Sequence, residues 1–105
     1  MRVNHSDIDG NQHCNMMVYI RFCHDAGALA VHKGRLKGFV NNLYDYRVKR
    51  IYIRYVRETL VNDELCVKGW EDMDNCGQLN FIIYRGEHIV TECSMAFYPR
   101  LNSKL

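Results

Sequence analysis

The chain has 105 residues, a formal net charge of +2 at neutral pH and a single proline, and 48% of its residues are apolar. This composition predicts one packed domain rather than a disordered chain, and so small a charge gives no support for nucleic-acid binding. No apolar run approaches the roughly 20 residues of a membrane-spanning helix, and the first residues lack the apolar core of a signal peptide. The five cysteines are odd in number and widely spread, which favours free thiols in the cytoplasm over a disulfide framework.

A strand is predicted over residues 1–7, and a loop over residues 8–14 leads from it into a helix. The helix is expected from Met16 to about Lys33, because apolar residues recur there at the spacing of one helix face, and Gly34 can end it. The expected apolar face consists of Met16, Tyr19, Phe22, Cys23, Ala26, Leu29 and Ala30.

Residues 34–46 allow two interpretations. Leu36, Phe39, Val40 and Leu43 have helical spacing, which predicts a short second helix. The turn-forming residues within the same stretch favour a loop that folds onto the core. Both interpretations remain open at this point.

From residue 47 onward the apolar period changes to two, which predicts strands. Val48–Arg57 is rich in β-branched and aromatic residues, and turn-forming residues separate it from three later segments with the same character. These segments are Leu65–Asp72, Gln78–Tyr84 and Glu87–Tyr98. One strand, a helix and four sequential strands predict an α+β domain in which the helix packs on one face of an antiparallel sheet.

The loop before the helix contains the candidate catalytic side chains. Acid, amide and imidazole side chains alternate there at Asp9, Asn11 and His13, and Asn15 can cap the free amides of the helix that starts at Met16. Backbone N–H groups at a helix N-terminus favour negative charge. Acyl transfer needs such a combination, because it requires a group that attacks or activates water and donors that hold an oxyanion.

The pattern Asp9-x-Asn11-x-His13-x-Asn15 resembles the signature of acyl-ACP thioesterases of the hotdog superfamily, and Tyr55-Val56-Arg57-Glu58-Thr59 resembles their Tyr-x-x-Glu segment. The 4-hydroxybenzoyl-CoA-type thioesterases share the first aspartate but are less similar at the histidine and the glutamate. The resemblance implies one hotdog domain over residues 1–105, with a long central helix wrapped by a curved antiparallel sheet. It also implies that part of the first strand is missing at the N-terminus, so the question of organelle targeting stays open.

The resemblance further implies a thioesterase that cleaves fatty acyl-ACP or acyl-CoA to a free fatty acid and a thiol. Asp9, Asn11, His13 and Glu58 are the catalytic residues that it implies, and no cofactor is required. The family builds its sites near subunit contacts, which implies a homodimer or a dimer of dimers. A metal site is not expected, because neither C-x-x-C nor H-E-x-x-H spacing occurs.

Each candidate also has a structural interpretation. Asp9 could cap the loop as an Asx turn, His13 could be a hydrogen-bonded loop histidine, and Glu58 could be an exposed glutamate at a strand end. Simple alternation places Glu58 on the face of Arg50 and Arg54, unless a bulge intervenes or that face turns inward near the strand end.

Four residues are candidates for substrate binding. Asn15 and Met16 start the helix, whose amides could hold the carbonyl oxygen of the thioester. Arg50 and Arg54 could bind the phosphates of CoA or of a phosphopantetheine-bearing acidic carrier protein. The alternative for both arginines is a solvated strand face whose charge protects the sheet edge.

Two other functions fit the same fold, because fold does not determine function. The domain could bind acyl-CoA or an acyl carrier without turnover, or it could hydrate enoyl or hydroxyacyl thioesters. The intact set of acid, amide and imidazole favours the thioesterase.

Overall fold

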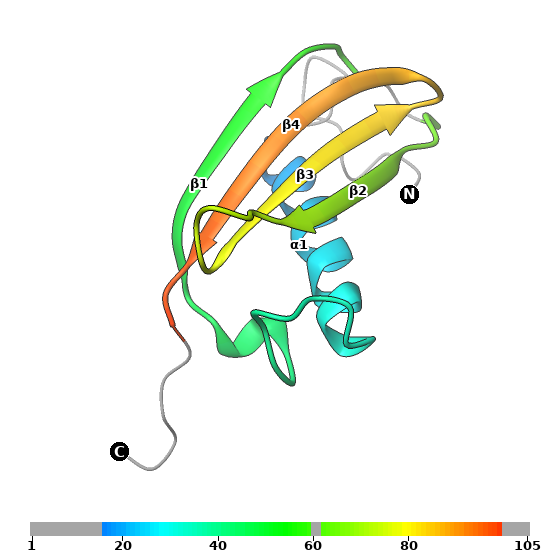
Figure 1. Cartoon of the computed structure of the whole chain (residues 1–105). Helices are drawn as coiled ribbons and strands as arrows, with labels where there is room; N and C mark the ends of the chain where they lie inside the picture. Colours follow the sequence, from blue (N-terminus) through cyan, green and yellow to red (C-terminus); the bar gives the residue numbers. More distant parts are fainter. Residues whose placement is uncertain (1–15, 60–61, 100–105) are drawn as a thin grey trace.

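The structure of the protein is a computed structural model, and it describes residues 16–59 and 62–99. The strand expected over residues 1–7 lies outside the described residues. No helix in the described ranges is both long enough and apolar enough to cross a membrane. The elements in chain order are α1 (Met16–His32), the short 3-10 helix η2 (Leu43–Asp45), β1 (Val48–Tyr55), β2 (Cys66–Glu71), β3 (Gln78–Arg85) and β4 (His88–Phe97) (Figure 1).

The strands form one antiparallel sheet in the order β1-β4-β3-β2, with α1 packed against one of its faces (Figure 1). Hairpins join β2 to β3 and β3 to β4, whereas β1 lies at the opposite edge of the sheet from β2. The prediction of an α+β domain with four sequential antiparallel strands is confirmed. With 17 residues, α1 is about 25 Å long, which is a moderate rather than a long helix.

The core lies between α1 and the inner face of the sheet. Alternate residues of β3 and β4 point into it, as expected for strands with one buried face. From the strands the core contains Leu79, Phe81, Ile83, Cys93, Met95 and Phe97, and from α1 it contains Val18, Tyr19, Phe22, Cys23 and Val31.

The buried face of α1 differs from the predicted one. Met16 and Leu29 are 47% and 53% exposed, whereas Val18 and Val31 are buried. The helix is turned so that Gly27 faces the sheet, where an added Cβ would lie 3.1 Å from Leu43 Cδ2 and 3.2 Å from Phe81 Cζ. This close approach places Leu29 at the rim of the interface instead of inside it.

The predicted end of α1 at Gly34 is confirmed. Gly34 has a φ of +68°, its N–H donates to the carbonyl of Val31, and the N–H of Arg35 donates to the carbonyl of Ala30, both at 3.0 Å. These two bonds form a Schellman motif, which satisfies carbonyls that the helix end would otherwise leave unpaired.

Replacing Gly34 by alanine is expected to lower the free energy of unfolding by about 1 kcal/mol, because a Cβ disfavours the left-handed conformation. An added Cβ would meet nothing within 4 Å, so the loss reports backbone conformation alone. Urea denaturation measures it, and Gly34→Asn should lose less, since asparagine tolerates positive φ. Equal losses in both variants would contradict this explanation.

The prediction of a short helix within residues 34–46 is wrong, and the alternative prediction, a loop folded onto the core, is confirmed. Asn41 has a φ of +64°, which interrupts any helix, and only the three-residue η2 follows it. Asn42 caps η2 by accepting a hydrogen bond from the Tyr44 amide. Phe39 and Leu43 are buried, so the apolar residues of the stretch serve the core from an irregular backbone.

Candidate functional site

The loop with the acid, amide and imidazole side chains lies outside the described residues. The roles of Asp9, Asn11, His13 and Asn15 therefore stay predictions. The first described residue, Met16, already belongs to α1. The first turn of α1 is thus one border of the candidate site.

A β-bulge precedes Glu58. After β1 ends at Tyr55, the amides of Val56 and Arg57 both donate to the carbonyl of Val90, at 2.8 and 3.1 Å. Val56 and Arg57 therefore both lie opposite the single residue Val90, and this extra residue shifts the alternation of the side chains that follow. Beyond the bulge, Thr59 is fully buried and Glu58 is exposed. The bulge that the sequence analysis named as one way to reorient Glu58 is present.

The segment that carries Glu58 is attached to the first turns of α1. Buried between them, the hydroxyls of Tyr19 and Thr59 form a hydrogen bond, and the rings of Tyr19 and Tyr55 lie 5.5 Å apart between centroids. From the other side, Arg85 Nη1 donates to the Glu58 carbonyl at 3.0 Å and to the Asp63 carboxylate at 3.2 Å. Residues 55–59 are therefore held at the end of α1 that the polar loop precedes.

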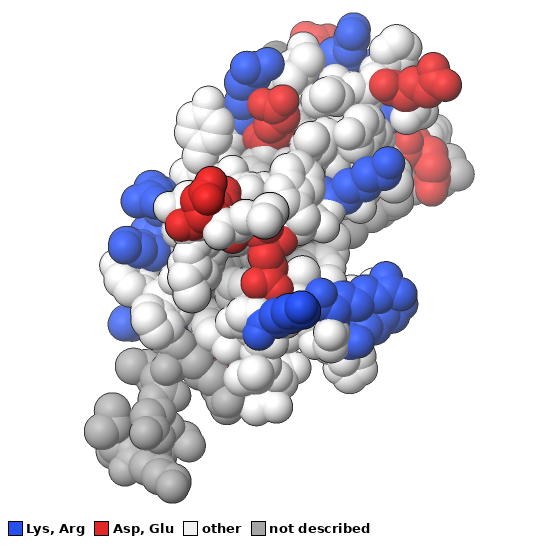
Figure 2. Space-filling view, in the orientation of Figure 1, with Lys and Arg blue, Asp and Glu red and all other residues white. Residues whose placement is uncertain are grey.

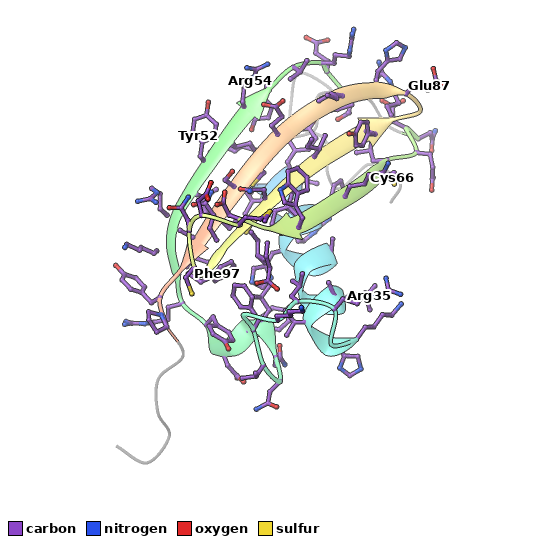
Figure 3. The ribbon with its side chains drawn as sticks, in the orientation of Figure 1. Arg35, Tyr52, Arg54, Cys66, Glu87 and Phe97 are labelled. Carbon is purple, nitrogen blue, oxygen red and sulfur yellow. The ribbon has the colours of Figure 1, made fainter. Side chains whose placement is uncertain are left out.

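The two candidate arginines lie on the outer face of the sheet, opposite α1. The Arg54 guanidinium is 3.5 Å from the Glu92 carboxylate on β4, its cross-strand neighbour. Arg50 borders a shallow hollow with Tyr52 and Ser94. Figure 3 shows Tyr52 and Arg54 projecting from β1 into solvent. This placement is the one that the solvated-face interpretation expects, and a role in phosphate binding stays a prediction.

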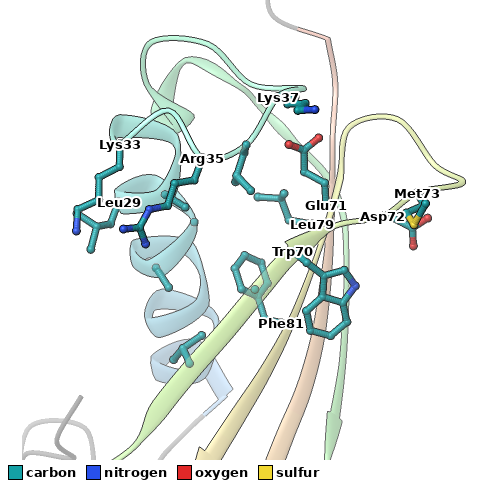
Figure 4. Close-up of a pocket in the computed structure, with 16 residues that line it drawn as sticks. Leu29, Lys33, Arg35, Lys37, Trp70, Glu71, Asp72, Met73, Leu79 and Phe81 are labelled. Carbon is teal, nitrogen blue, oxygen red and sulfur yellow. The ribbon is translucent and has the colours of Figure 1, made fainter.

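A groove of about 800 Å³ lies between α1 and β2 (Figure 4). Its α1 wall extends from Ala26 to Ala30, and Lys33 follows just after the helix, so the groove begins ten residues beyond Met16, about 15 Å along the helix axis. Between these positions the helix buries Tyr19, Phe22 and Cys23 in the core. The groove therefore belongs to the other end of α1 from the candidate catalytic loop.

The rim of the groove carries basic side chains without an ion pair in the described ranges and carboxylates that accept hydrogen bonds. Lys33, Arg35 and Lys37 line it and form no ion pair within the described ranges. Across from them, Glu71 accepts the Gly38 amide through both carboxylate oxygens, at 3.2 and 3.1 Å. Figure 2 shows a cluster of Lys and Arg side chains beside a hollow in the surface.

The neighbouring carboxylate, Asp72, is held by its own turn. It accepts hydrogen bonds from the Asn80 side chain at 3.0 Å and from the amides of Asp74 and Asn75 at 2.9 and 3.0 Å. These bonds, that from Asn80 first, lower the pKa of Asp72. These hydrogen bonds therefore favour the negatively charged form of Asp72.

Sequence reasoning missed the Tyr19–Thr59 pair and the groove. The available signals were a tyrosine on the apolar helix face near the polar loop, and the small residues Ala26, Gly27 and Ala30 on one side of α1. Neither signal indicates which residue is contacted, because Tyr19 and Thr59 are 40 positions apart and Gly27 approaches Phe81 from a distant part of the chain.

No protein-family model matches the sequence, and no curated protein matches it. Solved structures do match it. A Prochlorococcus marinus protein assigned as a thioesterase has a TM-score of 0.78 at 15% identity, over 99% of this chain and 80% of that one. The protein smu.793 of Streptococcus mutans, solved with acetyl-CoA, has a TM-score of 0.71 at 12% identity, over 97% of this chain and 80% of that one.

An acyl-ACP thioesterase of Bacteroides thetaiotaomicron has a TM-score of 0.69 at 22% identity over 93% of this chain. Our chain spans only about a third, 35%, of that enzyme's length. At such identities the likeness concerns the arrangement of the elements rather than the residues of a site. The helix, the four antiparallel strands and these matches together show that the chain has the hotdog fold found in thioesterases.

Proposed function

We propose that this protein hydrolyses fatty acyl thioesters, of CoA or of an acyl carrier protein, to a free acid and a thiol. The observation that carries the proposal is the attachment of residues 55–59, which include Glu58, to the first turns of α1. In the sequence, Asp9, Asn11 and His13 shortly precede Met16, the first described residue of that helix. The likeness in fold to thioesterases supports the same reaction class.

In the proposed mechanism, Glu58 or Asp9 takes a proton from a water molecule, whose oxygen attacks the carbonyl carbon of the thioester. Backbone amides at the start of α1, around Asn15 and Met16, stabilise the oxyanion that forms. The carbon–sulfur bond then breaks, and His13 protonates the departing thiolate. Histidine can exchange a proton near neutral pH, which suits this step. Asn11 orients the water or the carbonyl group.

The thiol carrier is proposed only as a class. An acyl-ACP thioesterase and a protein bound to acetyl-CoA are both among the structural matches, which supports a phosphopantetheine thioester of either kind. Arg50 and Arg54 remain proposed contacts for its phosphates. For Arg54 this contact requires exchange of the present pairing with Glu92.

The test is release of free thiol from a panel of acyl-CoA and acyl-ACP substrates of increasing chain length, with binding measured in parallel. Thiol release with multiple turnovers would support the hydrolase. Binding without release would indicate an acyl-binding module instead. Loss of an enoyl substrate without thiol release would indicate a hydratase.

We also propose a homodimer that forms through the edge of β1. Among the described strands, β1 is an edge strand, and Val48, Ile51 and Tyr52 are large, apolar and exposed on it. Ile51 lies on the α1 side of the sheet and Tyr52 on the outer side, since their partners on β4 are the buried Met95 and the half-exposed Ser94. A second β1 paired antiparallel across a two-fold axis would cover this edge.

Ile51→Asp is expected to weaken this dimer at least about tenfold, because it places two carboxylates near the symmetry axis of an apolar strand pair. Sedimentation equilibrium over a range of concentrations measures the effect. Val40→Asp, an equal change at an exposed loop position, should leave association unchanged. A monomeric wild type, or a variant that stays dimeric, would contradict the β1 interface.

A further inference from the structure

We propose that Cys23 and Cys93 form a disulfide when the protein meets a peroxide, and that this bond links α1 to β4 through the core. The pair is thus an oxidative modification site, and both thiols are free in the structure. The proposed hydrolysis uses neither residue, so the two proposals stand or fall separately.

Both cysteines are buried at the interface between α1 and the sheet. Cys23 is 0% exposed and Cys93 is 2% exposed, and both belong to the hydrophobic core. Cys93 lies on the inner face of β4, with Phe81 of β3 and Ile53 of β1 as its cross-strand partners. Cys23 lies about one turn before Gly27, where an added Cβ would come within 3.2 Å of Phe81 Cζ. The close approach at Gly27 therefore brings Cys23 over the part of the sheet that contains Cys93.

The two thiols are in direct contact, because they form a hydrogen bond in which Cys23 donates and Cys93 accepts. This hydrogen bond, followed by burial, raises the pKa of Cys23. The same hydrogen bond lowers the pKa of Cys93, and burial opposes that effect. Because the thiolate is the reactive form of cysteine, Cys93 is the member that reacts first and Cys23 is the member that completes the disulfide.

The reaction needs only a small movement of the two side chains. Sulfurs that share a hydrogen bond are already neighbours, and a disulfide brings them to about 2.05 Å. Neither the order of the strands nor the position of α1 on the sheet has to change for this approach.

The oxidant is hydrogen peroxide or another small peroxide. The Cys93 thiolate attacks one peroxide oxygen, the O–O bond breaks, and the departing hydroxide takes up the proton that Cys93 released and becomes water. Cys93 is then a sulfenic acid. The sulfur of Cys23 attacks the sulfur of Cys93, the S–O bond breaks, and the departing hydroxide takes the proton of Cys23. Two thiols and one hydrogen peroxide give one disulfide and two water molecules, and two electrons pass from sulfur to oxygen.

Burial sets the rate of this reaction. A peroxide reaches the pair when α1 opens locally from the sheet, so the pair should react more slowly than a thiol at the surface. Cys66 and Cys76 are exposed and serve as the internal standard for surface thiols. We expect both to be alkylated by N-ethylmaleimide in the native protein before Cys23 and Cys93.

The first test is peptide mapping of the wild-type protein after treatment with excess hydrogen peroxide under native conditions. Free thiols are blocked with N-ethylmaleimide in denaturant, and the protein is digested with trypsin without reduction. We expect the peptides 22–33 and 86–100 to be recovered as one species with the mass of a disulfide between them. Dithiothreitol should separate this species into its two peptides.

The second test isolates the pair in the variant C14S/C66S/C76S, which removes the other three cysteines. After oxidation, its intact mass should fall by two hydrogen atoms and it should lose both reactive thiols. Its melting temperature should rise by at least about 5 °C, because the disulfide closes a loop of about 70 residues. The matched control adds C23A to this variant and should show no disulfide and no rise. Circular dichroism confirms that each variant is folded, and the wild-type mapping decides the question if one is not.

Three outcomes would overturn the proposal. The first is absence of the linked peptides at a peroxide dose that oxidises Cys66 and Cys76. The second is their appearance only when the protein is denatured before oxidation, since the native fold would then keep the sulfurs apart. The third is a sulfinic acid at Cys93 in place of the disulfide, which would show that Cys23 cannot reach it.

Discussion

Asp9→Asn and His13→Ala are each expected to lower kcat for acyl thioester hydrolysis about a hundred- to ten-thousand-fold, the range for loss of a general acid or base. Asparagine keeps the size of Asp9 but cannot take a proton from water. Alanine at position 13 leaves the departing thiolate without a proton donor. Steady-state release of free thiol gives kcat, and urea denaturation verifies that stability is preserved.

Matched controls use the same chemical changes at exposed turns of the sheet. Asp74→Asn lies in the β2–β3 turn and His88→Ala begins β4, and both should retain wild-type turnover. If Asp9→Asn and His13→Ala also retain it, the loop is structural and the proposed hydrolysis at the start of α1 is wrong.

Glu58→Gln is expected to lower kcat about a hundredfold or more if Glu58 is the general base, with a much smaller change in KM. Glutamine preserves the shape of the side chain and removes only its capacity to accept a proton. The same change at Glu87, exposed in the β3–β4 hairpin, serves as the control and should have no effect.

A second variant tests whether the position of Glu58 matters. Thr59→Val removes the hydroxyl that bonds Tyr19 but keeps the buried shape of the side chain. We expect it to lower kcat, because Glu58 is displaced although its carboxylate is retained. A Glu58→Gln variant with full activity would leave Asp9 as the proposed base and remove Glu58 from the mechanism.

The strands were predictable because their side chains follow the local rule of alternation. Leu79, Phe81 and Ile83 alternate with half-exposed residues, and turn formers such as Gly86 separate one strand from the next. The helix was predictable for a similar reason, since its apolar period and Gly34 at its end are local signals. The packing of the helix on one face followed from these elements. The order of the strands did not, because β1 pairs with β4 and not with β2, its neighbour in the chain.

The features that the sequence did not predict depend on contacts between residues that are distant in the chain. Helical spacing at Leu36, Phe39 and Val40 predicted a helix, but the positive φ of Asn41 and the bond between Gly38 and Glu71 shape a loop there instead. Exposure of Leu29 follows from the close approach at Gly27, which periodicity does not report. For the candidate site, the sequence indicated Glu58 but not the Tyr19–Thr59 contact that positions its segment.

The shared Val90 carbonyl has a consequence for changes in chain length. Because two successive amides meet one acceptor after Tyr55, deleting a single residue there would restore a regular ladder and reverse the direction of every later side chain before residue 60. Thr59 would then face solvent, and its contact with Tyr19 would be lost. Insertions and deletions should therefore be excluded from this short stretch, whereas the tip of the β3–β4 hairpin at Gly86 can accept them.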